Sequence, residues 1–285
     1  MPKRYPDIIW TPRCRDSRLP KPAVTGAEID YNTPAAVRGI DMLLAKYHGR
    51  GFESEVYIAS PQSIPVAKLS KALKEAKIAL VTDGGLVPAG NPDGQPPVAA
   101  DKFRLYRFKG KKRLSPEDYE VSHQGYYNKF VLEDPNRLVP LDAARTAEAG
   151  GRIGALLEAF YSTAGVMQSV EKSREMGQGI ACSLRHNGVD GVILTSTCGT
   201  STRCGAYMAC EIEIAGIPVV HVTNLTQISE GVGCSRILKG SNISHVFGNP
   251  DIPPEQEAEW RKRLFDRALA LLEEVPDEDA CLIVN

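Results

Sequence analysis

The stretch "DGVILTSTCGTSTRCGAYMACEIEIAGIPVVHV", residues 190–222, contains the pattern that decides the fold. Its first part is an apolar, β-branched run that predicts a buried strand, and "GIPVVHV" at its end predicts another strand of the same kind. The segment between them carries apolar residues at helical spacing, and Gly216 stands where this helix should end. A strand, a helix and a second strand in this order predict two parallel strands joined by a crossover helix.

Cys198 directly follows the first of these strands and precedes the helix, whose first turn Ser201 or Thr202 is expected to cap. Ligands of open α/β sheets bind beyond the carboxyl ends of the strands. The free N–H groups of a helix start stabilise a thiolate, and Arg203 can add to this field. Gly199 is expected to leave room beside the sulfur. Cys198 is therefore our candidate nucleophile, the alternative being a small apolar residue packed at a strand end.

The other cysteines of the same segment have a different spacing. Seven cysteines form no disulfide framework, and a reducing compartment would keep them as thiols. Cys204 and Cys210 lie six residues apart and face different sides of a helix, so they do not form a zinc site. We expect Cys210 in the core and leave Cys204 open between a resolving thiol and a packed side chain.

The rest of the chain continues the alternation of strands and helices. The predicted fold class is α/β, a parallel sheet covered by helices on both faces in a Rossmann-like three-layer arrangement, with an irregular insertion around 87–140. Residues 1–70 are expected to pack as an N-terminal segment on a catalytic domain over 71–285. The predicted elements are a strand from Lys77 to Thr82 and helices in "TPAAVRGIDMLLAKY", from Asp142 to Phe160, from Val166 to Arg185 and from Glu255 to Glu274.

Composition narrows the function classes. The chain has 285 residues with 42% hydrophobic and 24% charged residues and a formal net charge of -1, which argues against a nucleic-acid or anionic membrane partner. The start of the chain lacks the apolar core of a secretion signal, and no stretch is long enough to cross a bilayer, so we expect a cytoplasmic protein. No glycine pattern typical of dinucleotide or nucleotide sites occurs, so neither a cofactor nor a metal is expected.

Supporting groups for Cys198 are nominated from other parts of the chain. "TDGG" follows a strand end, so Asp83 and the N–H groups of Gly84 and Gly85 are candidates for holding a polar substrate, the alternative being a self-capped turn. His123 in "EVSHQGY" is the first candidate acid or base, although it can instead orient its loop. Glu120 is a second candidate acid or base.

Hydroxyl groups next to the candidate nucleophile form a third group. Thr197, Thr200 and Ser201 are candidates for donating hydrogen bonds to a substrate carboxylate or to a developing anion. His221 lies inside the second strand and is expected to be a core residue.

The segment "TSTCGTSTRCGA" (195–206) resembles the active-site segment of the component B selenoprotein of glycine, sarcosine and betaine reductases, where selenocysteine stands at the position of Cys198. D-proline reductase has a related, smaller selenoprotein subunit. Further stretches resemble the same family in the same order: "KIALVTDGGLVPAGNPDG", "LSPEDYEVSHQGY", "DPNRLVPLD", "FYSTAG", "AGIPVVHV" and "FGNPDIPPEQE".

The resemblance implies a thiol or selenol nucleophile that cleaves a bond to carbon in a small nitrogen-containing compound. In those reductases the cleavage is reductive and uses a pyruvoyl group on another subunit and electrons from thioredoxin-like thiols. Two departures matter: cysteine replaces selenocysteine at position 198, and the family's cysteine three residues later is here Ser201. The nearby partner that could close a disulfide with Cys198 is therefore missing.

These departures favour a redox-neutral reaction, and the predicted function is cleavage of a C–S bond in a cyclic thioamide or thiourea-type compound, as in a desulfhydrase or desulfurase. One alternative is reductive C–N cleavage as the component B subunit of a reductase complex, with a pyruvoyl-bearing or carrier subunit and a thioredoxin-like donor as partners. Another alternative is a non-catalytic subunit of such a complex. A homo-oligomer is left open.

Overall fold

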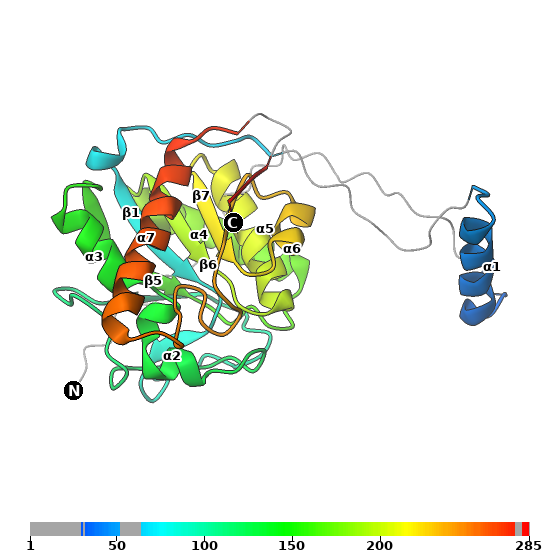
Figure 1. The fold of residues 1–285 in the computed structure, drawn as a ribbon, viewed down its shortest axis with the longest axis horizontal. Coiled ribbons are helices and arrows are strands. Elements are labelled where there is room, and N and C mark those ends of the chain that lie inside the picture. Colours follow the sequence, from blue (N-terminus) through cyan, green and yellow to red (C-terminus); the bar gives the residue numbers. More distant parts are fainter. Residues whose placement is uncertain (1–29, 31, 52–63, 277–280, 285) are drawn as a thin grey trace. The chain divides into compact units, whose positions relative to one another are not determined.

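The computed structural model describes residues 30, 32–51, 64–276 and 281–284 (Figure 1). The chain divides into two compact units, one of which contains helix α1 (Ala35–Tyr47) and the other all elements from residue 64 onward. Helix α1 matches the helix expected in "TPAAVRGIDMLLAKY", begins after Pro34 and buries none of its side chains. The expected packing of residues 1–70 on the catalytic domain stays a prediction, since much of that segment lies outside the described residues.

The second unit is built on a seven-stranded sheet with the order β3-β5-β1-β6-β7-β8-β9. All neighbouring strands pair in parallel except β3, which runs antiparallel to β5 at one edge. The strands are β1 (Lys77–Thr82), β3 (Arg104–Arg107), β5 (Ala155–Ser162), β6 (Gly191–Thr195), β7 (Val219–Thr223), β8 (Arg236–Lys239) and β9 (Leu282–Val284). The predicted α/β class with a parallel sheet is thus confirmed, with one antiparallel edge strand.

Alternating side chains of the strands pack into two separate hydrophobic clusters. Ile78 and Leu80 of β1 belong to a cluster that includes apolar residues of α3 (Leu141–Ala149) and α7 (Pro254–Glu273). Ala79 and Val81 belong to another cluster.

This other cluster includes apolar residues of two helices, α4 (Val170–His186) and α5 (Gly199–Ile214). Helix α6 (Thr226–Val232) contacts α5. Because successive residues of a strand point to opposite faces, helices cover both faces of the sheet. A Rossmann-like layering in the strict sense stays a prediction.

The segment 190–222 folds as expected, with β6, α5 and β7 in a crossover unit. By contrast, the helix predicted from Asp142 to Phe160 is wrong in its second half, because α3 ends at Ala149 and β5 follows. Gly151 has a φ of +68°, which L side chains rarely adopt, and it ends the helix. A Cβ on Gly154 would lie 2.5 Å from the backbone of Glu75, so the chain must pass close to the start of β1 at this point.

The insertion around 87–140 is irregular, as predicted. Strand β2 (Leu86–Pro88) pairs with β4 (Tyr119–Val121) in a small antiparallel sheet, while β3 joins the main sheet. A short helix, α2 (Lys129–Glu133), and a 3-10 turn, η3 (Pro135–Arg137), complete it. No helix within the described residues is both long and apolar enough to span a membrane.

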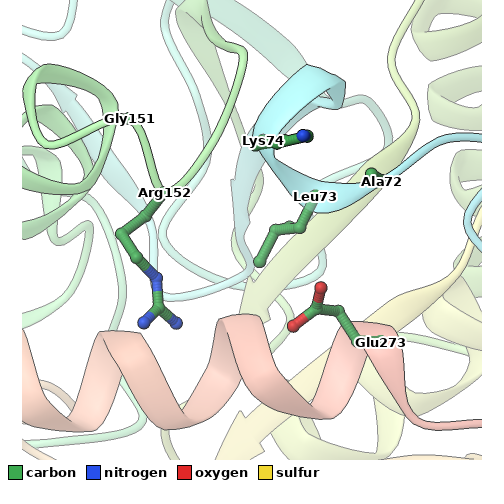
Figure 2. Close-up of a pocket in the computed structure, with 6 residues that line it drawn as sticks. All are labelled: Ala72, Leu73, Lys74, Gly151, Arg152 and Glu273. Atoms are coloured by element: carbon green, nitrogen blue, oxygen red, sulfur yellow. The ribbon is translucent and has the colours of Figure 1, made fainter.

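A pocket opens near the amino ends of β1 and β5, next to the 3-10 turn η2 (Leu73–Glu75) (Figure 2). Figure 2 shows Leu73 and Arg152 directed toward α7, and Glu273 directed from that helix toward them. The residues that line the pocket are Ala72, Leu73, Lys74, Gly151, Arg152 and Glu273. None of the residues nominated from the sequence belongs to this pocket, since Cys198 lies beyond the opposite ends of the strands.

Candidate active site around Cys198

Cys198 occupies the N-cap position of α5, three residues after β6 ends. Its carbonyl oxygen accepts the N–H of Thr202 at 2.8 Å, the first bond of the helix. The prediction that Ser201 or Thr202 caps the helix is therefore wrong, because α5 begins at Gly199 and both residues lie in its first turn. The Cys198 side chain is 9% exposed, and its Sγ lies 3.6 Å from Thr200 Oγ1.

The glycine that makes room for the sulfur is Gly125, and not Gly199 as the sequence suggested. A Cβ on Gly199 would meet Ile228 at 3.6 Å, an ordinary contact away from the sulfur. A Cβ on Gly125 would lie 2.7 Å from the Sγ of Cys198 and 2.8 Å from the His123 ring. The loop "HQGY" therefore lies directly against the thiol, and only a glycine at position 125 fits there.

His123 is buried in this loop and uses both ring nitrogens. Its Nδ1 accepts the N–H of Gly125 at 3.0 Å, which places the ring proton on Nε2, and Nε2 lies 2.7 Å from Ser201 Oγ. Burial lowers the pKa of His123 to about 4, so the ring is neutral near pH 7. Sequence and structure agree that the His123 loop meets Cys198, but the ring is bonded to Ser201, which favours the orienting role over acid–base catalysis.

Tyr126 closes the same loop against the end of β1. Its hydroxyl donates to the carbonyl oxygen of Gly84 at 2.9 Å, and its ring lies 4.9 Å from that of His123. Burial raises the pKa of Tyr126, and the nearby Asp83 and Cys198 raise it further. This residue therefore stays a neutral hydrogen-bond donor beside the thiol.

Asp83 begins a buried series of hydrogen bonds that runs across β1, β6 and β7, with His221 in the middle of β7. Ser196 Oγ donates to Asp83 Oδ2 at 2.8 Å and lies 2.8 Å from His221 Nε2, while His221 Nδ1 lies 2.7 Å from Ser229 Oγ. Burial raises the pKa of Asp83 well above its ordinary value, although the bond from Ser196 opposes this shift. These hydrogen-bonded side chains leave no space at Gly205, where a Cβ would lie 2.0 Å from Ser196 Oγ.

Two buried polar atoms near this chain have no hydrogen-bond partner within the described residues, namely Asp83 Oδ1 and Thr197 Oγ1. Asp83 is fully shielded from solvent in this structure. A substrate-binding role for Asp83 or Thr197 stays a prediction.

Gly84 and Gly85 do not offer free N–H groups to a substrate, which corrects the prediction. The N–H of Gly84 bonds to Thr82 Oγ1 at 3.1 Å, and that of Gly85 bonds to the carbonyl oxygen of Thr163 at 2.9 Å. Gly85 has a φ of +74°, and a Cβ there would lie 2.3 Å from the carbonyl oxygen of Ser122. Gly85 therefore serves the close approach of two loops, while a Cβ on Gly84 would meet the Leu138 side chain at 2.7 Å.

Three further nominated residues have other partners than the sulfur. Cys204 is buried in the cluster between the sheet and α4, and burial raises its pKa, which favours the packed alternative over a resolving thiol. Arg203 bonds to the carbonyl oxygen of Gln168 at 2.9 Å. Glu120 lies in β4 and accepts the N–H of Gly90 at 2.8 Å.

Gly125, Tyr126 and Ser196 were not predicted from the sequence to belong to the site, and His221 was expected in the core. Gly125 and Tyr126 stand two and three residues after the nominated His123, so the quoted motif was the available signal. Within the part of the chain that the structure describes, no three His, Cys, Asp or Glu side chains are grouped so as to hold a metal ion.

Comparisons with known proteins identify relatives. A family model described as "Glycine/sarcosine/betaine reductase selenoprotein B" matches residues 25–197. The chain is 44% identical to "Glycine reductase complex component B subunit gamma" of Carboxydothermus hydrogenoformans, over 83% of this chain and 54% of the relative. It is 40% identical to "Sarcosine reductase complex component B subunit beta" of Peptoclostridium acidaminophilum, over 85% of this chain and 55% of the relative.

A shorter relative matches over most of its own length. The chain is 31% identical to "D-proline reductase subunit gamma" of Acetoanaerobium sticklandii, over 80% of this chain and 90% of the relative. No solved structure matches the chain. The present chain spans about half the length of the glycine and sarcosine reductase subunits that it matches. The chain belongs to the glycine/sarcosine/betaine reductase selenoprotein B family.

Proposed function

We propose that this protein acts in the reductive cleavage of a C–N bond in a small amino compound, with Cys198 as the nucleophile and with other subunits of a reductase complex as partners. The observation that carries the proposal is the position of the Cys198 sulfur, which lies at the start of α5 and against Gly125 of the "HQGY" loop. The relatives are subunits of glycine, sarcosine and D-proline reductases, which supports reduction of such compounds.

The proposed reaction starts with attack of the thiolate on the carbon that carries nitrogen, next to a carboxyl group. A C–S bond forms as the C–N bond breaks, and the amine leaves with its bonding electrons and takes up protons from solvent. A second thiol then attacks the sulfur of the thioether, the carbon takes a proton, and a mixed disulfide remains. A third thiol reduces this disulfide, so that one dithiol supplies two electrons per amine released.

The second thiol is not supplied by the two positions nearest to Cys198 in the sequence that could carry it. Position 201 carries a serine whose hydroxyl is hydrogen-bonded to His123. Cys204 is buried, and its raised pKa makes it a poor thiolate. A dithiol donor or a partner subunit therefore belongs to the proposal.

The redox-neutral desulfuration expected from the sequence remains the competing hypothesis. The observation in its favour is that same serine, because it leaves Cys198 without a neighbouring sulfur that could share two electrons. The names of the relatives favour reduction. The dependence of turnover on dithiol distinguishes the two functions.

The test combines the purified protein with glycine, sarcosine or betaine, with and without dithiothreitol and with and without the other components of the Carboxydothermus complex. We expect release of ammonia, methylamine or trimethylamine, with one dithiol oxidised per amine. Cys198→Ser should abolish the release, while Cys182→Ser, a change at an exposed thiol, should not. Multiple turnovers without dithiol, full activity of Cys198→Ser or no release in any mixture would each contradict the proposal.

A further inference from the structure

The Thr200 side chain connects the Cys198 sulfur to a loop on the other side of the site. Its Oγ1 lies 3.6 Å from Cys198 Sγ and 3.2 Å from the backbone nitrogen of Met167. No other hydrogen bond of this hydroxyl occurs within the described residues. The Thr200 hydroxyl is thus placed between one donor-only group and the candidate nucleophile.

The direction of the two hydrogen bonds follows from the chemistry of the groups. A hydroxyl has one hydrogen and two acceptor lone pairs, whereas a backbone N–H can only donate. Thr200 must therefore accept from Met167, and its own hydrogen remains for the sulfur. A thiolate has no hydrogen, so an ionised Cys198 can only accept in this pair. A hydrogen bond to a charged acceptor is stronger than one between neutral groups.

The loop that supplies the N–H is held in an unusual conformation. Met167 has a φ of +58°, which a residue with a side chain adopts at a cost, and its side chain is 67% exposed. Its neighbours are bonded on both sides, since Val166 accepts the N–H of Ala99 at 2.9 Å and Gln168 accepts from Arg203 at 2.9 Å. Such over-determined strain is typical of functional sites. What the loop contributes at Met167 is its backbone N–H.

The helix start does not replace this hydrogen bond. The Cys198 side chain accepts no capping hydrogen bond from the N–H groups of the first turn. The partial charge of the helix acts on the sulfur only as a field, without a directed hydrogen bond. Thr200 is the direct donor that this geometry offers to the sulfur.

We infer that Thr200 is a catalytic residue, whose hydroxyl accepts the backbone N–H of Met167 and donates its own hydrogen to the Cys198 thiolate. The inference rests on the proposed role of Cys198 as the nucleophile. It adds a function for the strained 166–168 loop, which positions Thr200 rather than the substrate.

The test measures the rate at which iodoacetamide alkylates Cys198 at each pH, by peptide mass spectrometry, with exposed Cys182 as the reference in the same sample. Thr200→Val should move the midpoint of this rate profile upward by about one pH unit, the amount expected for loss of a charge-assisted hydrogen bond. Thr200→Ser keeps the hydroxyl and should keep the midpoint. Thr200→Ala offers the same comparison if the valine variant does not fold.

Thr197→Val is the matched control, because it removes a neighbouring hydroxyl that has no partner in the described structure. It should leave the midpoint of the alkylation profile unchanged. The inference is wrong if Thr200→Val keeps the parent midpoint in a folded protein, or if Thr197→Val shifts it equally. Alkylation needs no substrate, so a shifted midpoint together with a fully active Cys198→Ser variant would retain the hydrogen bond and reject the proposed function.

Discussion

The parallel strands begin at one side of the sheet, the amino edge, and end at the opposite side, the carboxyl edge. These two edges are built in opposite ways. At the amino edge, the pocket beside β1 and β5 is lined by exposed charged side chains, among them Lys74, Arg152 and Glu273. At the carboxyl edge, Cys198 and Asp83 are buried, and hydrogen bonds occupy most of the polar atoms around them. In this molecule an open pocket does not mark the candidate chemistry. The candidate chemistry lies instead where the backbone approaches closely and where buried polar side chains are hydrogen-bonded to one another. Substitutions at the two edges should therefore differ in their effects on turnover and stability.

The largest difference is expected for the nucleophile itself. Cys198→Ser should lower turnover by at least about 10³-fold with the fold retained, because a hydroxyl stays protonated where a thiolate attacks. Arg152→Ala at the opposite edge should keep turnover within about twofold. Steady-state amine release and circular dichroism of both variants make the comparison. Equal losses in the two variants would remove the distinction between the edges.

The second largest effect is expected for stability, at the tightly packed Gly205 next to Ser196 and His221. Gly205→Ala should lower the free energy of unfolding by about 3 kcal/mol, because its Cβ would lie 2.0 Å from Ser196 Oγ and 2.9 Å from His221 Nε2. Gly199→Ala is the matched control in the same helix, since its Cβ meets only ordinary contacts. It should change the free energy of unfolding by less than about 0.5 kcal/mol. Urea denaturation measures both, and a tolerated Gly205→Ala would show that the buried chain is loosely packed.

A smaller effect is expected from the titration of His123. Its pKa is lowered to about 4 in the folded protein, against about 6.5 in an unfolded chain. The stabilisation is therefore complete above pH 6.5 and is lost as the pH falls toward 4. Relative to His123→Gln, the parent should lose about 2–3 kcal/mol of unfolding free energy between pH 7 and pH 4.5.

The difference between the two proteins isolates this one group. Glu213, whose pKa burial raises to about 7, also titrates in this range but is present in both proteins. Urea denaturation at each pH gives the two curves. If the two curves run parallel, the pKa of His123 is not lowered in the folded protein.

The smallest effect is expected at the amino edge. Glu273→Ala and Lys74→Ala should each change the free energy of unfolding by less than about 0.5 kcal/mol, because both side chains are exposed. Thermal denaturation at two salt concentrations checks this expectation. A loss above 1 kcal/mol would show that the pocket residues carry an interaction comparable to those around Cys198.

Several parts of the site could be predicted because they are local in sequence. The order of strand, cysteine and helix in 190–222 places Cys198 at a helix start, whatever the rest of the chain does. The proximity of Asp83 to Cys198 followed from the rule that loops after parallel strands meet at one edge. His123 follows an antiparallel strand of the insertion, and its nomination depended on the resemblance of "LSPEDYEVSHQGY" to the reductase family. The error in 142–160 arose because residues 155–162 are amphiphilic enough for a helix, while pairing with β1 and β3 makes them a strand.

The sequence by itself determined the α/β class, the crossover unit and the position of Cys198, because periodicity and turn residues act over short distances along the chain. Only the tertiary structure decided which glycine lies against the sulfur and which hydroxyls bond to one another. Ser196 is hydrogen-bonded to both Asp83 and His221 because β1, β6 and β7 are neighbours in the sheet. Gly125 meets Cys198 because the loop after β4 packs against the start of α5. Such contacts between distant residues depend on strand order and on distances of a few tenths of an ångström, which no local pattern encodes.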